Sequence, residues 1–149
     1  IVTPGATAVM GLQRDAAAEV IRHTCSDRGA RLLEVAQLCA LTRRGFSTDG
    51  QDFRLRTPGG TRDLRLPLLG RHQLENAATA VVAVEALAEH GLNVSESALR
   101  RGLQEVRWPA RLEIVRRRPL VVLGDHPELR EWLATGLRRH PQVVHLPEA

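Results

Sequence analysis

Residues 70–80 read Gly70-Arg71-His72-Gln73-Leu74-Glu75-Asn76-Ala77-Ala78-Thr79-Ala80. From Ala77 to Ala88 the residues are almost all Ala, Val or Leu, which predicts a helix that is apolar on every side and surrounded by protein. Its first turn is polar instead, and buried polar groups need hydrogen-bonding partners. This polar cluster therefore predicts either a helix cap or the wall of a functional site.

The composition is that of a globular protein. The chain has 149 residues, of which 43% are hydrophobic and 26% charged, so it fits one domain or parts of two. It contains no apolar run near the roughly 18 residues that a membrane span needs, and no basic-then-apolar leader that would argue for export. Cys25 is expected in a helix and Cys39 in a loop, without metal-ligand spacing. We expect both to be free thiols of a cytoplasmic protein.

All 21 basic residues are arginine. A phosphate-binding loop of the G-x-x-x-x-G-K-[ST] type needs a lysine, so this chain cannot supply one. The net charge of +4 and a sequence pI near 10.7 would suit a nucleic-acid-binding domain. The arginines are mostly interleaved with Asp and Glu, however, and the longest run, residues 116–118, is predicted to be a solvated turn. Nucleic-acid binding therefore stays a remote alternative.

The first part of the chain predicts a parallel sheet. Residues 6–10 are expected to form a strand, residues 15–28 a helix that ends at Gly29, and residues 31–35 a second strand. This order is a β-α-β unit. The alternating stretches 53–56 and 64–66 then predict a hairpin around a Pro-Gly-Gly turn.

The second part predicts three helices and three strands. The opening helix should run over residues 71–90, and Ser95 should cap a second helix that reaches Val106 and presents Ala98, Leu99 and Leu103 on one face. Strands are expected over residues 112–115, 120–123 and 142–146, with a helix between the last two. We expect a linker at residues 116–118, before this second β-α-β unit.

Two motifs carry a family resemblance. The helix opening matches Gly-x-His-Gln-x-x-Asn-Ala at Gly70, His72, Gln73, Asn76 and Ala77. Downstream, Pro109-Ala110-Arg111-Leu112-Glu113 is similar to Pro-Gly-Arg-Leu-Glu, with Ala110 in place of Gly. In this order, the two motifs resemble the folylpolyglutamate synthase and dihydrofolate synthase family, which belongs to the Mur-type ATP-dependent amide ligases.

The resemblance implies an α/β fold in two incomplete domains. Residues 1–115 would be the back half of a P-loop-type central ATPase domain, and residues 116–149 the start of a Rossmann-like C-terminal domain. Both ends of the chain would then be cuts through a longer protein, monomeric when full length. Its phosphate loop and metal ligands would lie before Ile1.

The family's reaction joins a folate carboxylate, of dihydropteroate or a folylglutamate, to the amino group of L-glutamate. ATP first forms an acyl phosphate, and Mg²⁺ offsets the phosphate charge. By position, Asn76 matches the residue that hydrogen-bonds adenine, and Arg111 matches the catalytic arginine that reaches the ATP phosphates. His72 and Gln73 would shape the helix start and the adenine pocket.

One loop departs from the family pattern. The family usually has Asp-Gly-Ala-His-Asn-Pro after the buried strand, and its Asp and His meet the nucleotide. This chain has Gly124-Asp125-His126-Pro127 there. Asp125 and His126 could be that pair with altered spacing, or the loop could be an unrelated turn. The difference leaves a second hypothesis open, a non-catalytic family member that acts as a scaffold or regulatory partner.

Overall fold

A computed structural model describes residues 2–109, 113–117, 120–123 and 143–146. The chain begins with β1 (Thr7–Met10), α1 (Asp15–Asp27) and β2 (Arg31–Glu34). β1 and β2 pair in parallel, with Thr7 opposite Arg31. Gly29 has a φ of 58°, the left-handed conformation that lets the chain leave α1. The predicted β-α-β unit is therefore confirmed.

A three-stranded antiparallel sheet follows the short helix α2 (Val35–Leu38). It consists of β3 (Ala40–Ser47), β4 (Gly50–Thr57) and β5 (Gly60–Leu66), in that order. The predicted hairpin corresponds to β4 and β5, in which Thr57 pairs with Gly60 around the turn. On β4, Phe53 and Leu55 are fully buried while the arginines between and after them are exposed, as alternation requires.

β3 and α2 were not predicted from the sequence. The side chains of β3 are exposed or half-buried, so no apolar alternation marks the strand. Its pairing with β4 also shifts register between Arg43 and Gly45. β3 is specified by the hydrogen bonds that it makes to β4 rather than by its own pattern.

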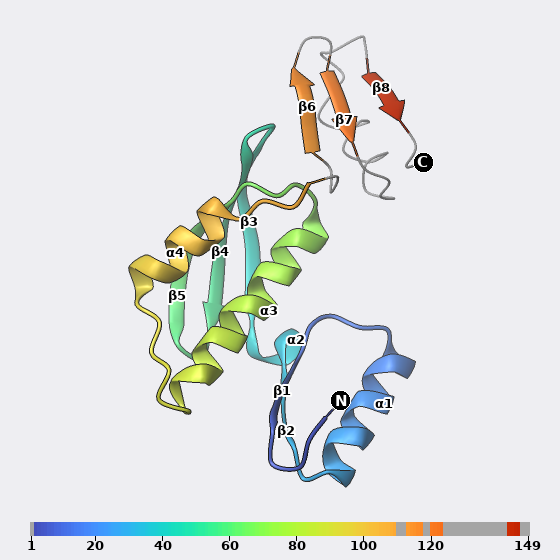
Figure 1. The fold of residues 1–149 in the computed structure, drawn as a ribbon, viewed down its shortest axis with the longest axis vertical. Coiled ribbons are helices and arrows are strands. Elements are labelled where there is room, and N and C mark those ends of the chain that lie inside the picture. The colour runs from blue at the N-terminus through green and yellow to red at the C-terminus, as the bar shows by residue number, and fades with distance from the viewer. Residues whose placement is uncertain (1, 110–112, 118–119, 124–142, 147–149) are drawn as a thin grey trace.

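Two helices lie against the antiparallel sheet, α3 (Arg71–Ala88) and α4 (Glu96–Glu105) (Figure 1). One face of α3 contributes much of the core; its apolar members are Leu74, Ala77, Ala78, Val81, Val82 and Ala86. All of these except Ala86 belong to one cluster with Phe53, Leu55 and Leu64 of the sheet. The prediction that this helix is buried on every side is wrong for the described residues, because Asn76, Ala80 and Leu87 are exposed. The buried face of α3 packs against the antiparallel sheet and also meets β1 and α2.

α4 begins as the sequence predicted. The Ser95 hydroxyl accepts a hydrogen bond from the backbone N–H of Ala98 at 3.2 Å, which caps the helix. Leu103 is buried and Leu99 is packed against the core, whereas Ala98 is exposed. α4 is therefore attached through a narrow apolar face.

The last described strands form a third sheet. β6 (Glu113–Arg117) pairs antiparallel with β7 (Leu120–Leu123), which pairs in parallel with β8 (Val143–Leu146). The parallel pair agrees with the predicted strands, and the helix expected between them lies outside the described residues. The prediction of a linker and solvated turn over residues 116–118 is wrong at Arg116 and Arg117, whose backbones pair with β7. The division into domains at residue 115 stays a prediction.

Candidate functional site

The start of α3 is held by a buried side chain from β4. Gln51 is fully buried, and its Nε2 donates to the carbonyl oxygens of Leu68 and Gly70, each at 2.8 Å. Gly70, which precedes α3, has a φ of 98° that favours glycine. Gln51 thus fixes the loop that sets where the helix begins. Gln51 was not predicted from the sequence, although it has the same strand parity as Phe53 and Leu55, which marks its side chain as facing the core.

Three of the predicted site residues lie together at the beginning of α3. Gln73 is buried, His72 is half-buried and Asn76 is exposed. The Asn76 Nδ2 group donates to the Gln73 Oε1 atom at 3.4 Å. A buried amide therefore orients an exposed one, which can both donate and accept hydrogen bonds. The other predicted site residues, Arg111, Asp125 and His126, lie outside the described residues.

A groove of about 440 Å³ separates α3 from α4. This volume is in the range of small-molecule sites. Its lining is almost entirely apolar, and its polar side chains are Gln73 and Asn76. The other lining residues are Leu66, Leu68, Ala77, Ala80, Val84, Val94, Ala98, Leu99, Gly102, Leu103, Val106 and Trp108.

This groove can accept a planar apolar group with a polar edge. The ring faces would contact aliphatic side chains, and the edge would meet the amide of Asn76. Trp108 lines the groove and is 53% exposed, so it offers a further aromatic surface there. The described lining residues include no charged side chain, so this part of the groove suits a base or ring better than a phosphate.

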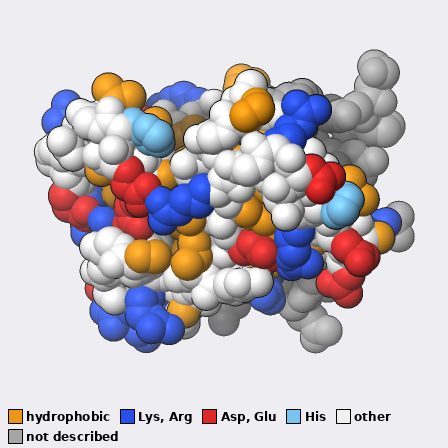
Figure 2. All heavy atoms as spheres, turned by 90° about the horizontal axis from the view of Figure 1, so that it is seen from below, with side chains coloured by type: hydrophobic (Ala, Val, Ile, Leu, Met, Phe, Trp, Pro, Cys, Tyr) orange, Lys and Arg blue, Asp and Glu red, His pale blue; other side chains and the backbone are white. Residues whose placement is uncertain are grey.

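Many arginines among the described residues are paired with carboxylates. Exposed examples are Arg22 with Glu34 at 2.6 Å, Arg54 with Asp63 at 2.6 Å and Arg65 with Asp52 at 3.0 Å. On the face shown in Figure 2, basic and acidic side chains are interspersed. This arrangement favours solvated ion pairs over a continuous basic surface of the kind that binds nucleic acid.

Other kinds of site find little support in the described part of the chain. It holds no group of three His, Cys, Asp or Glu side chains that could bind a metal ion. Burial raises the pKa of the Cys39 thiol, which disfavours the reactive thiolate, and both cysteines are free. No helix within the described ranges combines the length and apolar character that crossing a bilayer requires.

Comparison with known proteins shows which family of proteins the chain is similar to. No protein-family model matches the chain. It is 33% identical over 131 residues to the dihydrofolate synthase/folylpolyglutamate synthase of Bacillus subtilis, covering 86% of this chain and 30% of the relative. The chain is homologous to part of the folylpolyglutamate/dihydrofolate synthases.

Solved folylpolyglutamate synthases share the fold. The Mycobacterium tuberculosis enzyme complexed with ADP matches with a TM-score of 0.74 and 31% identity over 87% of this chain and 30% of that chain. A folylpolyglutamate synthase complex with AMPPCP and folate matches with a TM-score of 0.80 and 26% identity, over 95% of this chain and 36% of that chain. The chain therefore has the mixed α/β fold of these synthases and spans about a third of their length.

Proposed function

We propose that this chain is part of an ATP-dependent ligase that joins a folate-type carboxylate, of dihydropteroate or a folylglutamate, to L-glutamate. The observation that carries the proposal is the amide pair Gln73–Asn76 at the groove between α3 and α4. Relatives of the same fold are complexed with ADP, or with AMPPCP and folate. The protein would act in the cytoplasm as a monomer.

The described residues would bind the base of ATP. Asn76 would present its amide to the adenine edge, accepting from the exocyclic amino group and donating to a ring nitrogen. Gln73 would hold that amide in place through the hydrogen bond at 3.4 Å. His72, half-buried on the same turn, would help to shape the helix start. The apolar walls of the groove would exclude water from the ring faces.

The phosphates would be held by residues outside the described ranges. We assign Arg111 to the ATP phosphates, because a guanidinium presents a planar fork of donors to phosphate oxygens. Asp125 and His126 would approach the nucleotide from the C-terminal domain. When bound, ATP supplies the phosphoryl group that activates the folate carboxylate as an acyl phosphate. The described residues include no group of three His, Cys, Asp or Glu side chains that could hold a metal ion, so the Mg²⁺ ligands would lie outside the described ranges.

The test is nucleotide affinity in the whole protein. Asn76→Ala removes the hydrogen bonds to the base and should weaken ATP binding about tenfold, equivalent to about 1.4 kcal/mol. Asn93→Ala is the matched control, because Asn93 is an exposed asparagine in the loop between α3 and α4. Binding would be measured by titration calorimetry. Equal affinities for Asn76→Ala and the unaltered protein would contradict the assignment of Asn76.

A non-catalytic role remains the second candidate function. It is favoured by the sequence Gly124-Asp125-His126-Pro127, which differs from the family pattern at the loop assigned to the nucleotide. A folded whole protein that shows no ATP turnover with folate substrates and glutamate would establish the scaffold or regulatory role instead.

A further inference from the structure

We propose that Arg62 is a positioning residue that ties α3 to α4 and sets the width of the groove between them. The inference rests on the proposed function for its effect on nucleotide binding. The tie itself is a property of the described side chains and can be tested separately.

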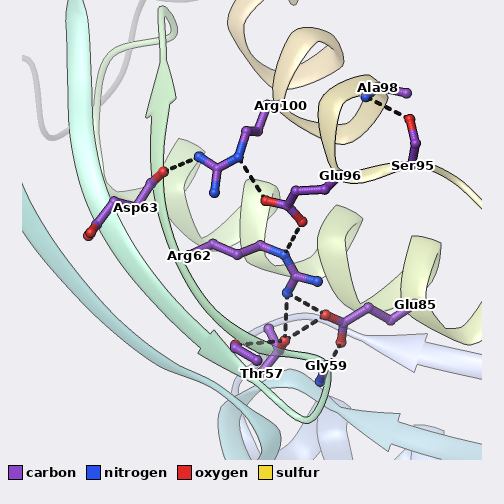
Figure 3. Close-up of polar contacts among 10 residues, drawn as sticks. Thr57, Gly59, Arg62, Asp63, Glu85, Ser95, Glu96, Ala98 and Arg100 are labelled. Atoms are coloured by element: carbon purple, nitrogen blue, oxygen red, sulfur yellow. Dashed lines mark hydrogen bonds and ion pairs between the residues drawn. The ribbon is translucent and has the colours of Figure 1, made fainter.

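One guanidinium from β5 contacts both helices. The Arg62 Nε group donates to Glu96 Oε2 of α4 at 2.9 Å, and its Nη1 group donates to Glu85 Oε1 of α3 at 2.6 Å (Figure 3). Nη1 also lies 3.1 Å from the Thr57 hydroxyl, which donates to Glu85 at 2.6 Å. The β4–β5 turn joins the same network through the Gly59 N–H, 3.4 Å from Glu85 Oε2.

The Arg62–Glu85 pair of this network is more protected than the ion pairs of the surface, whereas the Glu96 side chain is 49% exposed. The side chains of Arg62 and Glu85 are 15% and 20% exposed, against 46% and 64% for the pair Arg54–Asp63. Protection from water strengthens the attraction between the charges. The Arg62 hydrogen bond is also the main reason why the pKa of Glu96 lies below its ordinary value. A lysine could not replace this contact, because only a planar fork reaches two partners in fixed directions.

The two carboxylates stand next to the groove walls. Glu85 follows Val84 of the α3 wall, and Glu96 precedes Ala98 of the α4 wall. Along the axis of α3, Asn76 lies about 13 Å from Glu85, at 1.5 Å per residue. Trp108 lines the same groove beyond the end of α4. Arg62 therefore fixes the two walls beside one part of the groove, while the proposed base contacts lie farther along it.

α4 has few other anchors. Leu103 is its one buried residue among the described positions, Leu99 packs against the core, and Arg100 donates a hydrogen bond to the Asp63 carbonyl of β5. The Arg100–Glu96 ion pair lies within α4 and does not attach the helix to the rest of the fold. Without Arg62, Glu85 would lose its charged partner and face the Glu96 carboxylate across the gap. A tilt of α4 by about 5° about its first turn would move its last turn by about 1 Å. A displacement of that size would weaken the contacts between the α4 wall and a bound base.

The experiment compares two arginine variants in the whole protein. Arg62→Met should raise KM for ATP about tenfold and change kcat less than twofold, because the site is misaligned before chemistry. Arg54→Met is the matched control: Arg54 belongs to the same hairpin and also pairs with a carboxylate, but its partner is the exposed Asp63. Adding Glu85→Gln to Arg62→Met removes the unpaired charge and should lower the raised KM for ATP at least threefold.

Hydrogen exchange provides a readout that does not need activity. Arg62→Met should speed exchange of the amides in α4, and Arg54→Met should not. Unchanged exchange in α4 overturns the tie, and faster exchange with an unchanged KM for ATP overturns the positioning role. If the unaltered protein does not bind ATP, the proposed function fails and exchange alone decides the tie.

Discussion

Replacing Gln51 by leucine tests how a single buried amide positions the start of α3. Leucine has a similar size, so the change removes the hydrogen bonds and leaves little cavity. The Leu68 carbonyl loses the 2.8 Å hydrogen bond from Gln51 Nε2. The Gly70 carbonyl loses its own bond to Gln51 but still accepts from the Gln73 N–H at 3.2 Å.

These contacts give the expected magnitude. Leaving the half-buried Leu68 carbonyl without its donor costs about 1–3 kcal/mol, and the lost bond to Gly70 about 1 kcal/mol. Among the described residues Gln51 Oε1 is buried without a hydrogen-bond partner, so removing this atom returns about 1 kcal/mol. The free energy of unfolding of Gln51→Leu should therefore be lower by about 2 kcal/mol, a shift of roughly 30-fold in the folding equilibrium.

Urea unfolding and hydrogen exchange would measure the effect. We expect a lower unfolding free energy together with faster exchange of the amides in the first two turns of α3. The control is Arg56→Gln on the same strand, whose side chain is exposed and whose replacement should change stability by less than about 0.5 kcal/mol. If Gln51→Leu matches the unaltered protein in both measurements, Gln51 does not hold the helix start.

Two further predictions concern the same hairpin. Phe53→Ala should lower the unfolding free energy by about 3–5 kcal/mol in urea titration, because Phe53 is 1% exposed in the core; a loss below about 1 kcal/mol would contradict this burial. Asp63 should titrate by NMR below its ordinary pKa, chiefly because Arg54 donates hydrogen bonds to it. A lowered pKa means that the pair stabilises the fold above the ordinary pKa and that this contribution disappears as pH falls through the lowered value. Arg54→Met should return Asp63 toward ordinary titration, and an unchanged titration would show that the pair is absent in solution.

The elements that were predicted correctly have local signals. Alternating apolar residues marked β4, Gly29 marked the end of α1, and Ser95 marked the beginning of α4. In each case the residues that specify the element lie within it or beside it. β3 lacked such a signal, since its conformation depends on pairing with β4.

The residues of the candidate site also fall into those that a local motif indicated and those that depend on distant partners. The motif at His72, Gln73 and Asn76 indicated a site at the start of a helix, and the structure places these residues on neighbouring turns of α3. The sequence did not indicate that Asn76 would line a groove together with Trp108, because that groove is formed by residues of α3 and residues beyond α4. The buried role of Gln51 and the tie made by Arg62 were also missed, since their partners are distant along the chain.

The sequence by itself therefore determined the order and type of most elements, the polar opening of α3 and the family to which the motifs point. Only the tertiary structure decided which face of α3 is buried, how far α3 stands from α4, and which arginine holds them. The physical reason is the distance along the chain over which each interaction acts. Backbone propensity, capping and periodicity act over a few residues, whereas burial and ion pairing depend on which distant side chains the fold brings together.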